Sequence, residues 1–433
     1  MTLTTKVLLG MALGIVAGLG INVLGLAAEG SFLQIYLVDG LFNIVGKLFV
    51  NALKMLVVPL VLFSLISGVC GIGDIRLLGR IGTKAFALYM LTTAIAIASA
   101  LSVAGLIGIG KGMEAETSAS FEGAEAPALG DVLVNIVPDN PIAAMAEGEM
   151  LSIIFFAILV GISLLMVGKR ASGLVNAIDT ANEVMMKMVG IIMALAPYAV
   201  FCLLAKAMAQ LGLDLFVQLL GYVAVLIGVL LLHLFVTLQG ALVLFTGLNP
   251  LTFLRKMRNT QVFAFSTSSS NATIPVTLRT VVQRLGVNRS VASFTVPFGA
   301  TINMDGTAIM QGVATVFIAN IYGVELGVGG YLTVILMSVL ASIGTAGVPG
   351  VGLIMLSMVF TQVGLPLEGI GLILGVDRLL DMIRTAVNVS GDGVVSTIVA
   401  KSEGQFDRTI YDDPDAGAAD EDEPAHMPET TTA

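Results

Sequence analysis

The stretch 376-VDRLLDMIRTAVNVSGD-392 places six polar or charged side chains in a sequence otherwise rich in Leu, Ile and Val. The six are Asp377, Asp381, Arg384, Thr385, Asn388 and Asp392. At 3.6 residues per turn they fall within an arc of about 100° on one face of a helix. Because charged groups inside a bilayer are costly and usually functional, this face is a candidate site if the helix lies in a membrane.

The composition of the chain is that of a polytopic membrane protein. Of its 433 residues 56% are hydrophobic and only 12% are charged, whereas soluble domains carry about 25% charged residues. The mean hydropathy is +0.97. The net charge of −9 arises largely in the segment 412–433, which holds many carboxylates and no Lys or Arg. We expect this acidic tail to be disordered and solvated.

Eight apolar runs are long enough to cross a bilayer, since a spanning helix needs about 20 residues. They cover 7–28, 41–68, 84–108, 150–168, 176–208, 214–247, 290–322 and the run around the opening stretch, which ends near Lys401. Lys and Arg follow every even-numbered span and are scarce in the alternate loops. Cationic loops stay in the cytoplasm, so we predict that both termini are cytoplasmic.

Two further segments are too interrupted to be ordinary spans. The segment 259–278 has a serine-rich centre and Pro275, and cations flank both of its ends. The segment 331–364 is broken by 342-SIGTAGVPG-350, and neither flank carries a cation. Each segment therefore enters and leaves from one face as a re-entrant hairpin, and the two faces are opposite. The sequence predicts an all-α membrane protein with eight transmembrane helices and two re-entrant helical hairpins in inverted repeats.

The polar groups expected at membrane depth are rich in oxygen atoms. Asn303 and Asp305 lie in the seventh span, and Asn388 and Asp392 lie in the eighth. Carboxylate and amide oxygens suit small, hard cations. Polar contacts between helices are the alternative explanation, but two such pairs beside an arginine favour a cation-binding site.

Arg384 and Asp381 indicate the kind of solute that this face binds. Arginine offers a rigid fork of donors that matches a carboxylate. Asp381 lies one turn earlier and accepts from an ammonium group. Together they favour an amino acid with an acidic side chain over a C4-dicarboxylate, which has no ammonium group.

Several other motifs carry less information. The stretch 105-GLIGIGKG-112 resembles a phosphate-binding loop, but Gly112 stands where Ser or Thr is required and no strand precedes it. No Ser/His/Asp set and no zinc-ligand spacing is visible. His233 lies within an apolar segment, where a packed or interfacial histidine is expected rather than a proton relay. We expect neither an enzyme nor a nucleic-acid partner.

Two other classes of membrane protein use intramembrane carboxylates. An intramembrane aspartyl protease would employ Asp305 with Asp392, and a ligand-free ion channel would employ the oxygen ligands. Neither class accounts for Arg384 beside Asp381, or for two interrupted hairpins.

Five ordered motifs carry a resemblance to a known family: 89-YMLTT-93, 266-STSSSNATIP-275, 303-NMDGTA-308, 342-SIGTAGVPG-350 and 377-DRLLDMIRTAVNVSGD-392. Over about residues 1–410 the chain resembles the dicarboxylate/amino acid:cation symporter family, which includes sodium-coupled glutamate and aspartate transporters. The resemblance implies a homotrimer in the lipid of a bacterial inner membrane, in which a mobile domain slides like an elevator along a static scaffold. The implied divisions are scaffold 1–82 and 111–210, transport domain 83–110 and 211–411, and tail 412–433.

The resemblance also implies roles for individual residues, which we state as expectations. The substrate-binding residues would be Ser269, Ser270, Thr307, Gly347, Asp381, Arg384, Thr385 and Asn388. Sodium ions, the co-transported cations, would bind at three sites. The first comprises Gly299, Asn303, Asn388 and Asp392; the second Tyr89, Thr92, Thr93, Asn303 and Asp305; the third Thr301, Met304, Ser342, Ile343 and Thr345.

Two positions depart from the family pattern. Asn271 stands where relatives often carry serine or glycine, which affects the expected contacts of the first hairpin. Gln311 stands where animal relatives carry a glutamate associated with proton coupling. We therefore predict sodium-coupled uptake of aspartate or glutamate, and the alternative is proton- or sodium-coupled symport of a C4-dicarboxylate.

Overall fold

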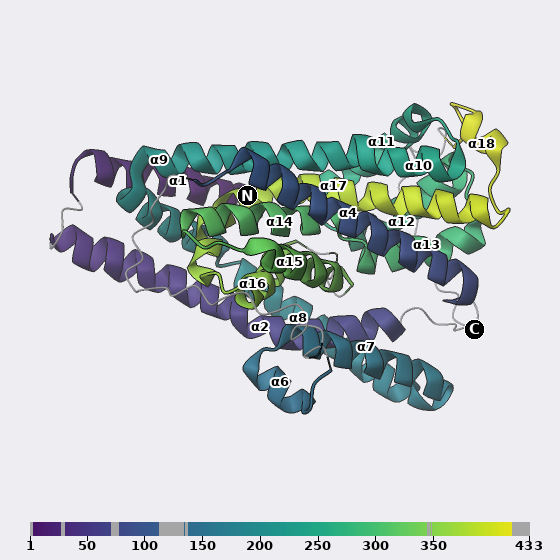
Figure 1. Cartoon of the computed structure of the whole chain (residues 1–433), viewed down its shortest axis with the longest axis horizontal. Helices are drawn as coiled ribbons and strands as arrows, with labels where there is room; N and C mark the ends of the chain where they lie inside the picture. The colour runs from purple at the N-terminus through teal and green to yellow at the C-terminus, as the bar shows by residue number, and fades with distance from the viewer. Residues whose placement is uncertain are drawn as a thin grey trace.

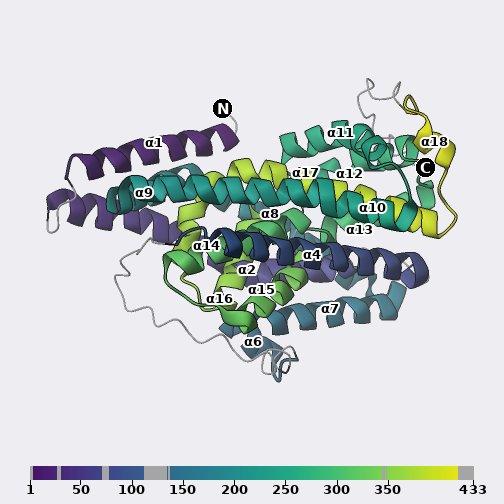
Figure 2. The ribbon, with the colours of Figure 1, turned by 45° about the horizontal axis from the view of Figure 1, so that its top comes forward.

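A computed structural model describes residues 3–26, 31–70, 78–111, 137–343 and 349–417, together with Val134 and Gly347. These residues are almost entirely helical (Figures 1 and 2). The helices of the first half are α1 (Leu3–Val23), η1 (Leu33–Phe42), α2 (Asn43–Cys70), η2 (Leu78–Gly82), α4 (Thr83–Ile107), α6 (Pro141–Glu147), α7 (Met150–Val167), η3 (Gly168–Ala171) and α8 (Ser172–Met193).

The second half of the chain begins with a long helix and ends beside the acidic tail. Its helices are α9 (Ala196–Leu232), η4 (His233–Thr237), α10 (Leu238–Thr246), α11 (Pro250–Thr267), α12 (Ser270–Arg279), η5 (Thr280–Arg284), α13 (Arg289–Ile302), α14 (Asp305–Ile321), α15 (Gly327–Ser342), α16 (Val351–Gln362), η6 (Leu367–Gly369), α17 (Ile370–Ser402) and α18 (Arg408–Asp412). The ionic stretch 376–392 lies within α17, which packs against α9, α11, α13 and α14 near the centre of the molecule (Figure 1).

Within the described residues, four helical segments are long and apolar enough to cross a membrane. They are Thr5–Val23, Arg80–Ile107, Ser152–Ile192 and Val217–Thr246. Helices α2 and α17 are comparably long, at 28 and 33 residues. Shorter apolar helices include Gly327–Ser342 and Val351–Gln362. The all-α prediction agrees with the structure, and the number of eight spans stays a prediction.

Two of the predicted spans are interrupted. The fifth was expected to run from 176 to 208 through Pro197, but α8 ends at Met193 and α9 begins at Ala196. Proline is favoured in the first turn of a helix because it has no N–H to donate, so Pro197 marks a helix start rather than an interior kink. The seventh span, expected over 290–322, separates into α13 and α14 at Asn303.

Each of the two serine- or glycine-rich segments forms a pair of packed helices. Helices α11 and α12 pack on each other, as do α15 and α16. At the first tip Ser268 has a φ of 51°, and the Ser269 side chain caps α12 by accepting from the backbone N–H of Ala272. Ser269 Oγ also donates to the carbonyl oxygen of Gly347 in the second tip, at 2.7 Å. The two tips therefore meet, while their placement in a bilayer stays a prediction.

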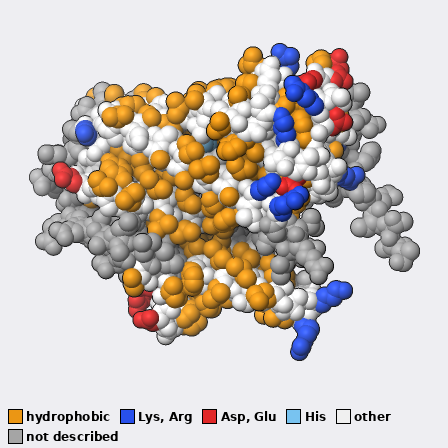
Figure 3. Space-filling view, turned by 45° about the vertical axis from the view of Figure 1, so that its right-hand side comes forward, with side chains coloured by type: hydrophobic (Ala, Val, Ile, Leu, Met, Phe, Trp, Pro, Cys, Tyr) orange, Lys and Arg blue, Asp and Glu red, His pale blue; other side chains and the backbone are white. Residues whose placement is uncertain are grey.

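The surface is strongly apolar. Figure 3 shows hydrophobic side chains across the middle of one face and most of its Lys and Arg side chains toward one end. Many large hydrophobic side chains are exposed, including Leu106, Phe32 and Leu244. An apolar surface of this extent requires a lipid or protein partner.

The end of α17 is tied to the beginning of α4. Glu403 accepts hydrogen bonds from Lys84 Nζ at 2.5 Å and from Arg80 Nε at 2.7 Å. The hydrogen bond from Lys84 is the main reason why the pKa of Glu403 lies below its usual range. These contacts hold the carboxyl end of α17 against the amino end of α4.

Lys256 joins the base of the first hairpin to the segment that follows α17. Its side chain is buried, and Nζ donates to the carbonyl oxygens of Arg284 and Ile410, both at 2.7 Å. We expect Lys256→Met to remove both hydrogen bonds and to lower the stability by about 1–3 kcal/mol. Thermal unfolding of the detergent-purified protein measures this change. The exposed Arg258 provides the control Arg258→Met, and equal unfolding temperatures for the two variants would contradict the role of Lys256.

Candidate functional site

The break between α13 and α14 brings polar groups of the seventh predicted span against α17. Asn303 and Met304 have non-helical backbone, with φ/ψ of −100°/90° and −118°/46°. The first N–H groups of α14 have no carbonyl partner within the helix. One of them, the N–H of Gly306, donates to Asn388 Oδ1 on α17 at 2.7 Å. A hydrogen bond to α17 therefore stabilises the break between α13 and α14.

Asn303 connects the break to two further residues of α17. Its Nδ2 donates to the carbonyl oxygen of Asn388 at 3.0 Å and to Asp392 Oδ1 at 2.8 Å. Its Oδ1 is buried and has no hydrogen-bond partner among the described residues. Asn388 Nδ2 points to the sulfur of Met304 at 3.3 Å. Oxygen atoms of Asn303, Asn388 and Asp392 thus lie together in a buried place, and their assignment to the first sodium site stays a prediction.

Gly299 allows these groups to approach closely. A Cβ atom at this position would lie nearer than 3.0 Å to both Asp392 Oδ1 and the hydroxyl of Tyr89, a separation that real Cβ atoms do not show. The carbonyl oxygen of Gly299 accepts from the N–H of Asn303 at 2.7 Å. Only glycine fits between the carboxylate and the phenol.

Asp305 is the centre of a second buried group. Its Oδ1 accepts from Thr93 Oγ1 at 2.6 Å and lies 3.4 Å from Thr92 Oγ1. Its Oδ2 lies 3.0 Å from His233 Nε2. The side chains of Asp305 and His233 are both fully buried. Tyr89, also expected here, is buried nearby and donates to the carbonyl oxygen of Thr295 at 3.0 Å.

The sequence did not reveal the contact between His233 and Asp305. His233 was expected to be packed, and it is fully buried. Its partner lies 72 positions away, on a different helix. No spacing rule links two residues so far apart. Only tertiary packing brings them together, because η4 packs against α4 and α4 packs against α14.

Arg384 is fully buried between two carboxylates of its own helix. Nη2 donates to Asp381 Oδ1 at 2.8 Å, and Nη1 lies 2.7 Å from Asp377 Oδ1. The second contact is close but does not have the angle of a hydrogen bond. Arg378 lies 3.8 Å from the other oxygen of Asp381. Two arginines therefore offset two aspartates, which a buried ionic group requires.

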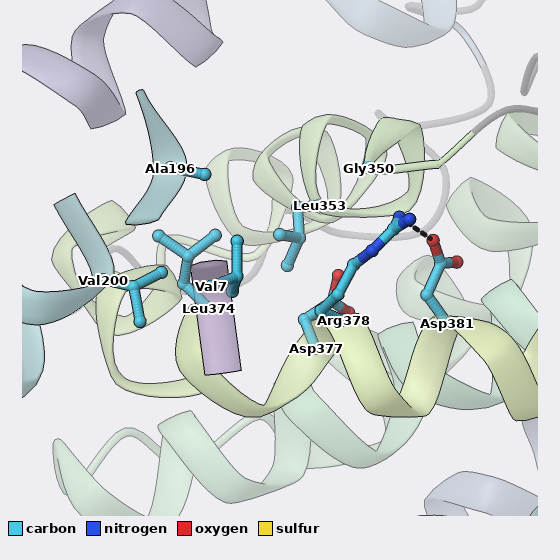
Figure 4. Close-up of a pocket in the computed structure, with 9 residues that line it drawn as sticks. All are labelled: Val7, Ala196, Val200, Gly350, Leu353, Leu374, Asp377, Arg378 and Asp381. Atoms are coloured by element: carbon cyan, nitrogen blue, oxygen red, sulfur yellow. Dashed lines mark ion pairs between the residues drawn. The ribbon is translucent and has the colours of Figure 1, made fainter. Parts of the chain in front are cut away.

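A narrow crevice lies beside these charges (Figure 4). It is lined by Asp377, Arg378 and Asp381 of α17, by the start of α16, and by apolar side chains of α1 and α9. Its cavity volume is only about 10 Å³, which is about the space of one water molecule. A solute larger than water therefore needs the surrounding helices to move before it reaches these charges.

The second hairpin lies directly on the arginine. A Cβ atom at Gly352 would lie 3.2 Å from Thr307 Cγ2 and 3.5 Å from Arg384 Nη2. Another at Gly347 would lie 3.0 Å from Ser270 Cβ. Thr307, Arg384 and the two hairpin tips are thereby gathered on one side of α17. Thr385 follows Arg384 directly in α17. Its hydroxyl donates to the carbonyl oxygen of Asp381, one turn earlier, at 2.8 Å.

The third expected sodium site is only partly described. Thr345 lies outside the described residues. Thr301 and Ser342 each donate to a carbonyl of their own helix, to Pro297 at 3.0 Å and to Val339 at 2.7 Å. Ile343 is buried at the end of α15. Within the described part of the chain no hydrogen bond of Thr301 or Ser342 joins α13 to α15.

Comparison with known proteins supplies the class of molecule. The model of the Sodium:dicarboxylate symporter family matches residues 3–402. This chain belongs to that family. The resemblance predicted from the motifs is thus confirmed. The chain is a multi-pass membrane protein of a transporter family, and this family consists of symporters rather than enzymes.

The relatives differ in the substrate and cation that their names state. A proton/sodium-glutamate symport protein of Bacillus caldotenax is 31% identical over 407 residues, covering 92% of this chain and 96% of the relative. The proton/glutamate-aspartate symporter of Escherichia coli is 33% identical over 420 residues, covering 94% of each. The C4-dicarboxylate transport protein of Bacillus subtilis is 33% identical over 370 residues, covering 84% of this chain and 87% of the relative.

Proposed function

We propose that this symporter imports aspartate or glutamate together with sodium ions. The observation that carries the proposal is the buried Arg384, which is paired with Asp381 one turn away and covered by the second hairpin. An acidic amino acid matches both groups. The side-chain carboxylate of the substrate would accept hydrogen bonds from the guanidinium of Arg384. Its ammonium group would then donate to the carboxylate of Asp381, which Arg384 no longer contacts. Arg384 and Asp381 thus each exchange their mutual contact for a contact with the substrate, and neither charge is left without a partner.

The first hairpin tip supplies the proposed site for the α-carboxylate. Ser269 and Ser270 begin α12, and the amino end of a helix favours an anion. The contact of Ser269 with Gly347 brings this tip beside the second hairpin. Thr307, Thr385 and Asn388 complete the proposed pocket.

The two buried oxygen clusters support sodium as the coupled ion. Among the described residues, neither Asp305 nor Asp392 forms an ion pair with Lys or Arg. A buried carboxylate without a cation is costly, so a small cation at each cluster offsets its charge. Gln311 is buried and neutral in α14, where animal relatives carry a glutamate associated with proton coupling. This position supports sodium coupling without a proton.

The proposal includes an elevator mechanism in a homotrimer of the bacterial inner membrane, with both termini in the cytoplasm. Residues 83–110 and 211–411 form the moving domain, and 1–82 and 111–210 form the scaffold. Packing of α17 against α4 and against α10 to α14 supports one moving unit. The crevice beside Asp381 is too narrow for an amino acid, which supports a carrier that must rearrange to admit its solute.

Symport of a C4-dicarboxylate is the second candidate, favoured by the similarity to the Bacillus subtilis C4-dicarboxylate transport protein. Succinate uses the fork of Arg384 but leaves Asp381 without an ammonium partner. The carboxylate of Asp381 then faces a second anion at close range, which disfavours binding. The pairing of Asp381 therefore favours the amino acid.

Uptake into proteoliposomes tests the proposal. We expect concentrative uptake of labelled aspartate when sodium is high outside, and no concentration of aspartate when only a proton gradient is present. Unlabelled aspartate and glutamate should compete strongly, and succinate and serine weakly. Uptake that follows a proton gradient without sodium would contradict the coupling, and strong competition by succinate would favour the dicarboxylate.

A further inference from the structure

His233 lies at an irregular point of the long rod formed by α9 and α10. The chain between Leu232 and Leu238 forms the π-helical turn η4, which begins at His233. Such turns disturb the regular ladder of hydrogen bonds and occur often at functional sites. The turn packs against α4 and α17, and the imidazole is fully buried. A polar side chain therefore points from the rod into the interior.

Asp305 is held on both of its oxygen atoms. His233 Nε2 lies 3.0 Å from Oδ2, and Thr93 donates to Oδ1 at 2.6 Å. A carboxylate that binds a cation is ionised and only accepts hydrogen bonds, so in that state the imidazole donates from Nε2. Together the two donors fix the rotation of the carboxylate about its Cβ–Cγ bond.

The other ring nitrogen shows that packing alone does not explain the histidine. His233 Nδ1 is buried and has no hydrogen-bond partner among the described residues. A buried polar atom without a partner is unfavourable, and a leucine of similar size would avoid that cost. The benefit must come from Nε2, whose partner is Asp305.

We propose that His233 is a positioning residue for cation binding. Its Nε2–H fixes Asp305 so that the carboxylate presents a defined oxygen toward Tyr89, Thr92, Thr93 and Asn303. Partners behind a metal-binding group commonly orient it in this way. The inference rests on the proposed function, because it takes Asp305 as a ligand of the co-transported sodium ion.

Three variants at this position separate positioning from packing. Glutamine extends its Nε2 about as far as the imidazole Nε2, asparagine places its Nδ2 near Nδ1, and leucine has no donor. We expect His233→Leu and His233→Asn to raise the sodium concentration for half-maximal aspartate uptake about 10-fold, the lower end of the range for such partners. His233→Gln should stay within about 3-fold of the natural protein on the same basis.

Gln239 provides the matched control. It is buried on α10, six positions after His233, and donates to the carbonyl of Leu234 instead of contacting Asp305. Gln239→Leu should leave the sodium dependence unchanged. The KM for aspartate at saturating sodium should also be unchanged in the His233 variants, because the proposed substrate contacts are intact. Sodium titration of the substrate-free, purified protein by calorimetry gives the same comparison without transport.

The outcomes are distinguishable. Wild-type uptake that does not depend on sodium would overturn the proposed coupling and this inference with it. Sodium-dependent uptake with an unchanged half-saturation constant in His233→Leu would overturn the inference alone. If His233→Leu does not fold, the glutamine and asparagine variants decide, because equal sodium dependence in these two amides would overturn the positioning role.

Discussion

Arg384→Cys is expected to reduce aspartate uptake at least about 25-fold. Loss of one partner from a buried charge pair costs about 2–5 kcal/mol, and each 1.4 kcal/mol is a factor of ten. Arg384 is fully buried and its guanidinium is the proposed partner of the substrate side chain. Initial rates of labelled aspartate uptake into proteoliposomes measure the effect, with serine uptake assayed in parallel. Because cysteine leaves space and no positive charge, we expect the variant to accept a neutral amino acid better than an acidic one.

Two further variants separate recognition from folding. Removing Arg384 leaves Asp377 and Asp381 buried with too little compensating charge, which destabilises the protein. The double variant Arg384→Cys with Asp377→Asn removes one of the two carboxylates, so it should be produced more abundantly and still fail to take up aspartate. Arg378→Cys makes the same substitution at the neighbouring arginine, which reaches Asp381 only at 3.8 Å, and should retain most uptake. Substantial aspartate uptake by the folded double variant would overturn the role of Arg384.

The features that the sequence predicted well depend on local patterns. The ionic face of α17 follows from the spacing of polar residues in one helix, and the structure buries Arg384, Asn388 and Asp392 along it. The paired helices of each hairpin follow from serine, glycine and proline in otherwise apolar segments. In both cases the deciding residues lie within one or two helical turns of each other, so spacing alone carries the information.

The features that the sequence did not predict depend on packing between distant elements. The break at Asn303 occurs at residues that are not in themselves strong helix breakers, and it is supported by Asn388 on another helix. The contact of His233 with Asp305 joins η4 to α14. Asp377 had no assigned role, yet it lies against Arg384 two turns later. Pairing rules for residues three or four apart do not identify a pair separated by seven.

Gly299→Ala is expected to impair sodium binding about 5- to 150-fold. The added methyl group would lie nearer than 3.0 Å to Asp392 Oδ1 and to the Tyr89 hydroxyl, so at least one of these proposed ligands must move. Forcing an extra carbon into a filled interior costs about 1–3 kcal/mol, which corresponds to that range of affinity. The sodium concentration for half-maximal aspartate uptake measures the effect. Because Gly299 makes no proposed contact with the substrate, the KM for aspartate at saturating sodium should change far less.

Gly240→Ala is the control for this substitution. Gly240 also lies inside a helix, but a Cβ atom there would have no neighbour within 4 Å. Alanine is the better helix former, so this variant should transport normally with unchanged or slightly increased stability. A normal sodium dependence in Gly299→Ala would show that the close approach of Asp392 and Tyr89 is not needed to bind the ion. A raised sodium requirement in Gly299→Ala alone would instead support an ion held between α4, α13 and α17, where the carboxylate of Asp392 has no Lys or Arg partner among the described residues.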